Sequence, residues 1–367
     1  MAATPPITVI CHRLVAMGVS TEHRNEWLLL LNKGDFFMKN SKKLQRLCLP
    51  ALAGALLAIA APATVQAAAF PEHAIKLVVP WSPGGATDVL GRILAKGLTA
   101  QLKQTVVVEN KAGAGGNIGT SAFVREKPDG YSLLVATSST NAANPHLYKR
   151  LGFDAQKDFA PIAFVANIPN VLEVPKDSRF ATATDLLKFA KENPGQLNYG
   201  SAGVGSSQHL ATSLLQHITG ARFTHIPYKG SGPAVSDLLG KRLDFMIDTG
   251  SMAQVKGGNL TALAVASKKR IPFLPDVPTF EEVGVKDMVA SAWYGIVAPK
   301  GTPADVVDTL NKAVNNALKD PQTRAQLEGM GAQVVEGDNT SSEFGAFIQS
   351  EITRYAELVK MSGAKPE

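Results

Sequence analysis

The sequence contains little cysteine, with only Cys11 and Cys48 among its 367 residues. Both lie within residues 1–67, which we expect to be absent from the mature protein. The remaining 300 residues then contain no thiol, no disulfide and no cysteine-based metal site. Such a chain must derive its stability from a hydrophobic core, and its length is sufficient to form one.

The expected mature chain also lacks a strong charge of either sign. Residues 1–67 contain seven of the 37 basic residues and three of the 31 acidic residues. Their removal leaves 30 basic and 28 acidic residues, a net charge of +2. The sequence pI of 9.1 therefore largely reflects the removed part. Because no basic stripe follows the chain, we expect no nucleic-acid partner.

Residues 38–67 are typical of a secretory signal peptide. Positive charge between Lys39 and Arg46 precedes an uncharged run of fifteen residues, Leu47–Ala61, and small residues allow cleavage before Ala68. A membrane-spanning helix needs about 20 apolar residues, more than this run provides. We therefore expect export to the periplasm.

Residues 1–37 show no clear pattern ahead of this leader. We interpret them as a start-site extension and expect translation to begin at Met38.

Strand-like and helix-like runs alternate along the mature chain, which is typical of α/β layers on parallel sheets. The expected strands are Ile75–Val79, Thr105–Glu109, Tyr131–Ala136, Leu197–Gly200, Phe223–Tyr228, Phe245–Asp248, Leu260–Ser267 and Ala292–Ala298. The expected helices are Val89–Leu102, Asn117–Glu126, Ala183–Glu192, Ser206–Thr219, Pro233–Leu239, one starting at Ala304, and Phe344–Met361. Candidate crossings between two sheets are Phe164–Val174 and Ala266–Phe273.

The turn after the first expected strand is the most informative local feature. Pro83, Gly84 and Gly85 allow the backbone to turn sharply, and Thr87 or Asp88 can cap the helix that follows. Such a turn directs unpaired backbone N–H groups at one point, and the start of a helix carries partial positive charge. The turn therefore suits an anion.

A second turn of this kind lies in Asn198–Leu210, with the sequence NYGSAGVGSSQHL. Gly203 and Gly205 follow a short strand, and Ser206 or Ser207 can cap the next helix. The two turns would face each other across a cleft, although ordinary strand-to-helix turns have the same composition.

Seven motifs in order resemble the periplasmic solute-binding receptors of tripartite tricarboxylate transporters, also called Bug receptors. The resemblance extends from Phe70 to near the end of the chain. The motifs are VPWSPGGATD (79–88), ENKAGAGGNIG (109–119), KPDGYSLLVA (127–136), YGSAGVGSSQHL (199–210), HIPYKGSGPAVSDLLGKRLDFM (225–246), PDVPTFEEVG (275–284) and WYGIVAPKGTP (293–303).

This resemblance implies an α/β fold of the two-domain periplasmic binding protein class, a type II-like flytrap. Each domain would be a mainly parallel sheet flanked by helices, and the chain would end in helices. We expect residues 68–166 and 268–367 to form one domain and residues 167–267 the other. Such a monomer would bind a small organic acid or amino acid and deliver it to inner-membrane permease subunits, without catalysis or a cofactor.

The resemblance also implies a set of ligand-binding residues. They are Trp81, Ser82, Pro83, Gly84, Gly85, Thr87, Thr137, Ser138, Gly200, Ser201, Gly203, Gly205, Ser206, Ser207, Tyr228 and Asp248. The glycines would let the backbone approach the ligand, and the hydroxyl groups would donate hydrogen bonds. Trp81 either floors the pocket or belongs to the core. Asp248 either receives an amino or hydroxyl group or caps the turn before Gly250.

Two other functions remain open from the residues alone. A sensory receptor of the same fold would report its ligand state to a membrane kinase. An exported enzyme is disfavoured, because GAGGNIG (113–119) does not fit the G-x-G-x-x-G fingerprint. The sequence also has no P-loop, no G-x-S-x-G elbow and no cysteine nucleophile in the mature chain.

Overall fold

The computed structural model describes residues 70–337 and 339–364, so the predicted extension (1–37) and signal peptide (38–67) lie outside the described residues. Residues 68–367 form one compact unit. Within the described ranges, no helix has both the length and the apolar character needed to cross a membrane.

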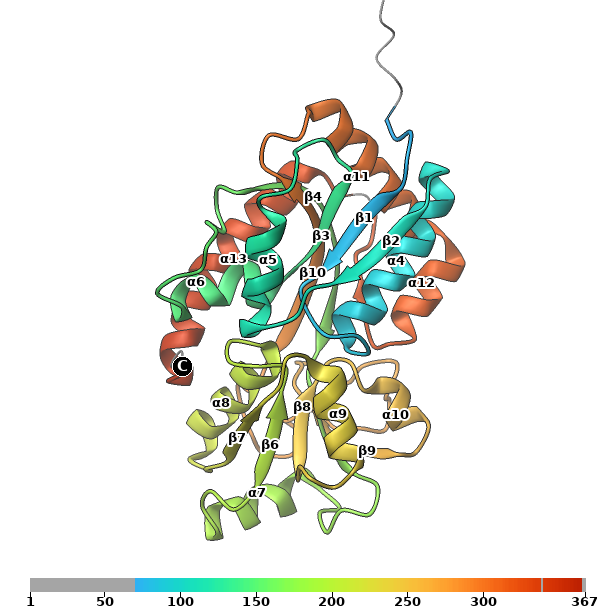
Figure 1. Ribbon diagram of the computed structural model, residues 1–367. Helices are drawn as coiled ribbons and strands as arrows, with labels where there is room; N and C mark the ends of the chain where they lie inside the picture. Colours follow the sequence, from blue (N-terminus) through green and yellow to red (C-terminus); the bar gives the residue numbers. More distant parts are fainter. Residues whose placement is uncertain (1–69, 338, 365–367) are drawn as a thin grey trace, which may run out of the picture. The chain divides into compact units, whose positions relative to one another are not determined.

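The first sheet has six strands in the order β11-β4-β10-β3-β1-β2 (Figure 1). The strands are β1 (Ile75–Val79), β2 (Val106–Asn110), β3 (Ser132–Thr137), β4 (Phe159–Pro169), β10 (Ser291–Pro299) and β11 (Gln333–Val334). β1 runs parallel to both of its neighbours, whereas β10 runs antiparallel to both of its own.

Helices cover both faces of the first sheet. One face packs against α4 (Ala86–Leu102), α11 (Ala304–Lys319) and α12 (Pro321–Glu328). The other face packs against α5 (Asn117–Phe123), η3 (Ser139–Ala143), α6 (Asn144–Leu147) and α13 (Ser341–Ser362), and the short η2 (Ala114–Gly116) precedes α5. The apolar stripe expected from Ala304 is confirmed, since Leu310, Val314 and Leu318 of α11 are buried.

The second sheet has five strands in the order β7-β6-β8-β5-β9. They are β5 (Val171–Pro175), β6 (Asn198–Ser201), β7 (Thr224–Pro227), β8 (Phe245–Asp248) and β9 (Leu260–Val265). Its flanking helices are α7 (Ala183–Glu192) and α8 (Ser207–Thr219) on one face, and α9 (Ser231–Leu239) and α10 (Met252–Lys256) on the other. We call the two sheets with their helices the first and second lobes.

The sheets are mixed, which corrects the expectation of mainly parallel sheets. β6 runs parallel to both neighbours, but β5 runs antiparallel to both of its own, as β10 does in the first lobe. β5 and β10 are the strands that follow a crossing between the lobes. They therefore do not belong to strand–helix–strand units, which make neighbouring strands parallel.

The crossings are held together by backbone hydrogen bonds. Asn170, the single residue between β4 and β5, donates to Ala290 O at 3.0 Å, Ala266 donates to Asn170 O at 2.8 Å, and Ala290 donates to Ala266 O at 3.0 Å. Asn170 and Ala290 lie where the chain passes between the lobes, and they are candidates for the hinge of a closing motion.

The segment between Ala266 and β10 packs on the second lobe. Phe280 and Val285 lie in the core of that lobe, and Phe280 N–H donates to Val265 O at 3.1 Å. The predicted domain division assigns residues 268–290 to the first lobe, so the packing of this segment differs from it. The reason is that the chain adds a short pairing to β9 before it returns.

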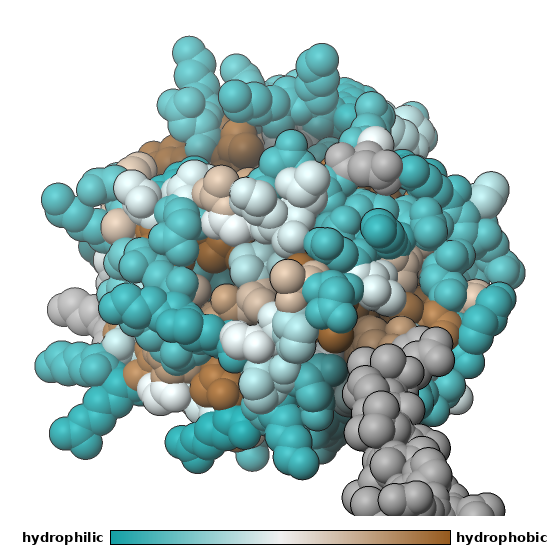
Figure 2. Space-filling model, turned by 90° about the horizontal axis from the view of Figure 1, so that it is seen from above, coloured by the Kyte–Doolittle hydropathy of each residue, from teal (hydrophilic) through white to brown (hydrophobic). Residues whose placement is uncertain are grey.

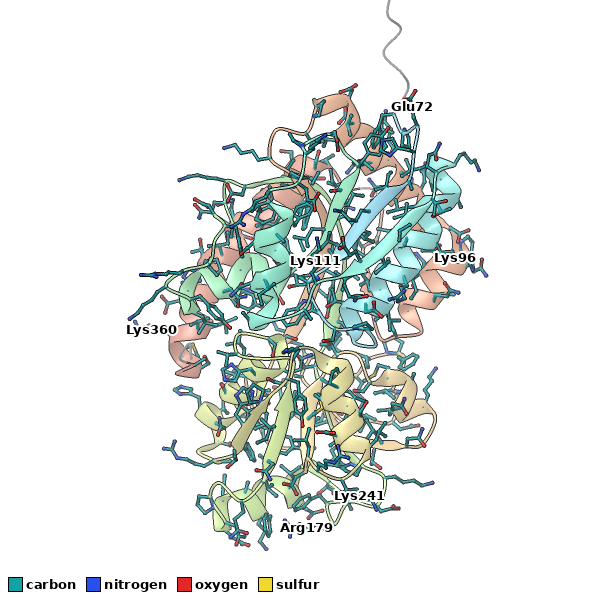
Figure 3. All side chains as sticks on the ribbon, in the orientation of Figure 1. Glu72, Lys96, Lys111, Arg179, Lys241 and Lys360 are labelled. Atoms are coloured by element: carbon teal, nitrogen blue, oxygen red, sulfur yellow. The ribbon has the colours of Figure 1, made fainter. Side chains whose placement is uncertain are left out.

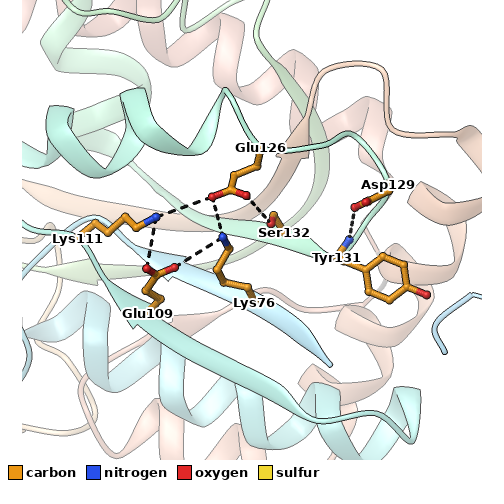
Figure 4. A network of polar contacts seen from close by, with 7 residues as sticks. All are labelled: Lys76, Glu109, Lys111, Glu126, Asp129, Tyr131 and Ser132. Atoms are coloured by element: carbon orange, nitrogen blue, oxygen red, sulfur yellow. Dashed lines mark hydrogen bonds and ion pairs between the residues drawn. The ribbon is translucent and has the colours of Figure 1, made fainter. Parts of the chain in front are cut away.

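A network of ion pairs lies beside β1 and β2, among partly exposed side chains (Figure 4). Lys76 Nζ lies 2.6 Å from Glu126 Oε1 and 3.7 Å from Glu109 Oε2, and Lys111 also contacts both carboxylates. The hydrogen bond from Lys76 lowers the pKa of Glu126 below its usual value, although partial burial opposes the shift. The network balances two positive and two negative charges, so it leaves no free charge for a ligand.

Figure 2 shows hydrophobic residues scattered among hydrophilic ones on the face that it displays. The exposed large hydrophobic residues, which include Val107, Ile118 and Leu239, come from separate elements. Most large hydrophobic side chains of the described chain therefore lie in the cores between the sheets and their helices.

Candidate ligand-binding site

A pocket lies between the two lobes, lined by residues from both. The lining residues are Trp81, Gly85, Ala86, Thr87, Thr137, Ser138, Ser139, Ala202, Ser207, Gln208, Ser231, Thr249, Ala292 and Tyr294. Most of them belong to segments that follow a strand or begin a helix. The pocket is therefore built from the ends of elements in both sheets.

Three helices begin at this pocket. The first residues of α4, α8 and α9 are Ala86, Ser207 and Ser231, and all three line it. The residues preceding α4 and α9, Gly85 and Gly230, have no side chain that could cap the helix. Because the first N–H groups of a helix have no partner within the helix and carry partial positive charge, the pocket favours an anion.

No lysine or arginine lines the pocket. The labelled basic side chains Lys96, Arg179 and Lys241 lie at the periphery, away from the region between the sheets (Figure 3). Within the described part of the chain, no three histidine, cysteine, aspartate or glutamate side chains gather in a possible metal-binding group. An anion here would be held by backbone and hydroxyl donors.

Asp88 fixes the first turn. Its carboxylate accepts hydrogen bonds from Gly84 N–H at 3.0 Å, Asn110 Nδ2 at 2.9 Å and Arg92 Nε at 3.0 Å. Burial acts to raise the pKa of Asp88, but these hydrogen bonds outweigh it and the pKa is lowered. Arg92 is thus paired with Asp88 and serves the turn rather than the ligand.

Trp81 belongs to the core and also lines the pocket, so both of its expected roles are combined. Its side chain is 6% exposed, and its indole Nε1 is buried without a hydrogen-bond partner. Ser138 Oγ is also buried without one, although the Tyr355 hydroxyl lies close enough for Ser138 to affect the pKa of that tyrosine. Since an unpaired buried donor costs free energy, the indole N–H of Trp81 is a candidate donor to a ligand.

The second turn is held by side chains behind it. Ser201 Oγ accepts from Gly203 N–H at 3.0 Å and lies 2.6 Å from His225 Nε2, and His209 Nδ1 accepts from Gly205 N–H at 3.3 Å. Gly203 and Gly205 have φ values of 120° and 81°, which favour glycine. Ser201 and His209 therefore shape the turn, and neither lines the pocket.

His209 and His225 stack with their ring centroids 4.4 Å apart. Because both rings are largely buried, we expect the protein to lose stability in acid. Burial lowers the pKa of His209 to about 3, assisted by His225, and burial lowers the pKa of His225 to about 4. The unfolded chain binds these protons near pH 6.5 and the folded chain does not. Stability is therefore lost as the pH falls from about 6.5 toward 4, by up to about 1.4 kcal/mol per pH unit and histidine.

Melting temperatures between pH 4 and 7.5 measure this loss. His209→Asn, whose Oδ1 can replace Nδ1 as the acceptor, should flatten the dependence on pH. His217→Asn is the matched control, since His217 is exposed on the same helix. An unchanged slope in His209→Asn would contradict the assignment.

The structure brings together only part of the predicted residue set. Trp81, Gly85, Thr87, Thr137, Ser138 and Ser207 line the pocket. Ser82, Gly203 and Tyr228 line a neighbouring groove that also spans both lobes. Pro83, Gly84, Gly200, Ser201, Gly205, Ser206 and Asp248 line neither of them. Asp248 accepts from Gly250 N–H at 2.9 Å, as expected of a residue that caps this turn.

Sequence reasoning missed several lining residues, chiefly Gln208, Ser231, Thr249 and Tyr294. Ser231 could have been recognised, because Gly230-Ser231-Gly232 comes directly before the predicted helix Pro233–Leu239, as glycines do in the two recognised turns. Thr249 and Tyr294 had none, since their hydroxyl groups meet only in the fold, 3.3 Å apart and from different lobes.

Glycines of the second lobe lie against the first turn. A Cβ atom added to Gly250 would lie 2.5 Å from Ala86 N, and one added to Gly232 would lie 2.3 Å from Pro83 O. Two hydrogen bonds also join the lobes, from Ser82 Oγ to Lys229 O at 3.1 Å and from the Tyr148 hydroxyl to Val204 O at 2.9 Å. The lobes thus meet backbone to backbone around the pocket.

Comparisons with known proteins agree with this architecture. Residues 90–364 match the family described as tripartite tricarboxylate transporter family receptor. Protein BugT of Bordetella pertussis is 40% identical over 311 residues, which cover 84% of this chain and 94% of that protein.

Two solved structures are similar in fold as well as in sequence. The periplasmic binding protein BugD is 38% identical with a TM-score of 0.78, covering 81% of this chain and 100% of that one. An R. palustris protein solved with adipate is 34% identical with the same TM-score and the same coverage. The two-lobed α/β fold is therefore confirmed, and the chain belongs to the periplasmic solute-binding receptors of the tripartite tricarboxylate transporter family.

Proposed function

We propose that this receptor captures a small organic carboxylate in the pocket between its lobes and delivers it to the inner-membrane permease subunits of a tripartite transporter. The convergence of three helix N-termini on a pocket without a basic side chain carries this proposal. The similar R. palustris protein was solved with a dicarboxylate, adipate, which supports the same class of ligand here.

The binding free energy that is required indicates how such a ligand would be held. Micromolar binding requires about 8 kcal/mol. Each helix terminus contributes roughly 0.3–1 kcal/mol, and up to about 2 when partly buried. Three termini therefore fall short, and several hydrogen bonds of about 0.5–1.5 kcal/mol each must supply the rest. Closure of the lobes around the ligand makes those bonds and excludes water.

A thermal-shift screen of purified residues 68–367 tests the proposal. The panel contains mono-, di- and tricarboxylates, amino acids and neutral sugars. We expect stabilisation by acids alone, about 2.7 kcal/mol at 100 times the dissociation constant. The screen is repeated after unfolding and refolding, which removes any ligand carried from the expression host. Stabilisation by sugars, or by no acid after refolding, would contradict the proposal.

We further propose that the mature receptor is a periplasmic monomer that begins at Ala68 after signal-peptide cleavage. The motif arrangement in residues 38–67 supports this start. The intact mass of the exported protein measures its first residue, and light scattering measures its oligomeric state.

A further inference from the structure

A buried carboxylate, that of Asp248, lies directly behind the residues with which the second lobe lines the pocket. Asp248 is completely buried and accepts four hydrogen bonds. Gln208 Nε2 and Ser231 Oγ donate to its Oδ1, both at 2.8 Å, while Gly250 N–H and Ser251 Oγ donate to its Oδ2, both at 2.9 Å. Four donors match the four lone-pair positions of an ionised carboxylate.

A second acid behind Asp248 reinforces this arrangement. Glu173 is also completely buried, and its Oε2 contacts Ser251 Oγ. Burial and the neighbouring Asp248 raise the pKa of Glu173 well above its usual value. Glu173 therefore keeps its proton.

The carboxylate of Asp248 determines which atoms Ser231 can offer to a ligand. A serine hydroxyl has one hydrogen, and Ser231 donates that hydrogen to Asp248. Ser231 lines the pocket, so its free lone pairs make it an acceptor there. Gln208 is fixed in the same way, since flipping its amide would bring Oε1 against the Asp248 carboxylate.

Ser231 thus adds a hydrogen-bond acceptor to a pocket that the starts of three helices line with donors. The start of α4 and the indole of Trp81 offer donors. Ser231 lies directly against that start, because a Cβ atom added to Gly85 would be 3.1 Å from Ser231 Cβ. A ligand in the pocket beside this contact therefore meets donors from the helix starts and, at Ser231, an acceptor whose own hydrogen is held by Asp248.

We propose that the ligand is a carboxylate that also carries a hydroxyl or ammonium group, and that this group donates a hydrogen bond to Ser231 Oγ. The inference rests on the proposed function and narrows its ligand class. A plain carboxylic acid that lacks such a donor leaves the Ser231 lone pairs unpaired inside a closed pocket, which lowers its affinity.

Calorimetric titration of residues 68–367 with matched acids tests this inference. Each series keeps one carbon skeleton: succinate, malate and aspartate; glutarate, 2-hydroxyglutarate and glutamate; propionate, lactate and alanine. We expect a donor-bearing acid to bind about tenfold or more tightly than its unsubstituted partner in the series that binds best. Comparison of the hydroxy with the amino acid distinguishes the two donors.

Ser231→Ala should abolish this preference and keep the affinity for unsubstituted acids within about threefold. The variant retains the Cβ that faces Gly85. Ser251→Ala is the matched control, because Ser251 donates to the other oxygen of Asp248 and does not line the pocket. It should leave the preference unchanged.

The outcomes separate the two proposals. If acids bind and the unsubstituted acid equals or exceeds its donor-bearing partners in each series, the inference about Ser231 fails and the carboxylate receptor stands. If no acid binds, the proposed function fails. The ratio of the affinities for unsubstituted and donor-bearing acids, measured on the unaltered protein, tests the inference even if Ser231→Ala does not fold.

Discussion

Replacing Gly250 with alanine is expected to lower ligand affinity by about 100-fold or more, equivalent to about 2.7 kcal/mol. The added methyl group would lie 2.5 Å from the backbone nitrogen of Ala86, where the lobes meet. Backbone at the start of a helix cannot move aside as a flexible side chain can. The lobes would therefore stop short of the closed arrangement in which the ligand makes its hydrogen bonds.

The unliganded fold of Gly250→Ala should stay intact, because Gly250 does not have a positive φ. Isothermal calorimetry measures the affinity, and small-angle scattering measures whether ligand still contracts the protein. Gly345→Ala is the matched control, since its new Cβ would make an ordinary 3.4 Å contact with Pro161. Unchanged affinity in Gly250→Ala would show that this approach of the lobes is not needed for binding.

Asp88→Ala should destabilise the protein by about 2–4 kcal/mol and weaken ligand binding as well. Asp88 is 3% exposed, and its removal leaves Gly84 N–H and one hydrogen of Asn110 without their acceptor. It also releases Arg92 from its ion pair. The first turn would lose the contacts that direct its backbone toward the pocket.

Urea denaturation measures the loss of stability in Asp88→Ala. Asp305→Ala is the control, because Asp305 occupies the first turn of α11 but is exposed, and we expect it to change stability by less than about 0.5 kcal/mol. Asp88→Asn separates charge from shape. Equal stabilities of Asp88→Ala and the unaltered protein would refute the role of Asp88 in the turn.

The sequence pattern predicted the elements whose signal is local. β1, α7 and β8 have the predicted bounds, since a buried apolar run or a helical stripe between turn residues is readable in a short window. β4 was missed because Pro161 and Pro169 interrupt its pattern. The partner strand changes register at Pro161, and such an irregularity is where a sheet accommodates proline.

The site was predictable only in part, for a related reason. The first turn and Ser207 could be recognised because a glycine turn before a helix is local. The role of Ser231 depends on Asp248, which is seventeen residues away in the sequence and 2.8 Å away in the fold. No spacing rule connects the two residues. They meet because Asp248 ends β8 and Ser231 begins α9, and the fold brings these two ends together.

The backbone contacts around the pocket have a consequence for how such receptors diversify. Closure depends on main-chain surfaces at Gly232 and Gly250, whereas recognition depends on side chains such as Ser231 and Gln208. Substitutions that alter recognition need not alter the closing surfaces. Gene duplication can therefore yield receptors for new nutrients while the moving parts, and the shape offered to the transporter, remain the same.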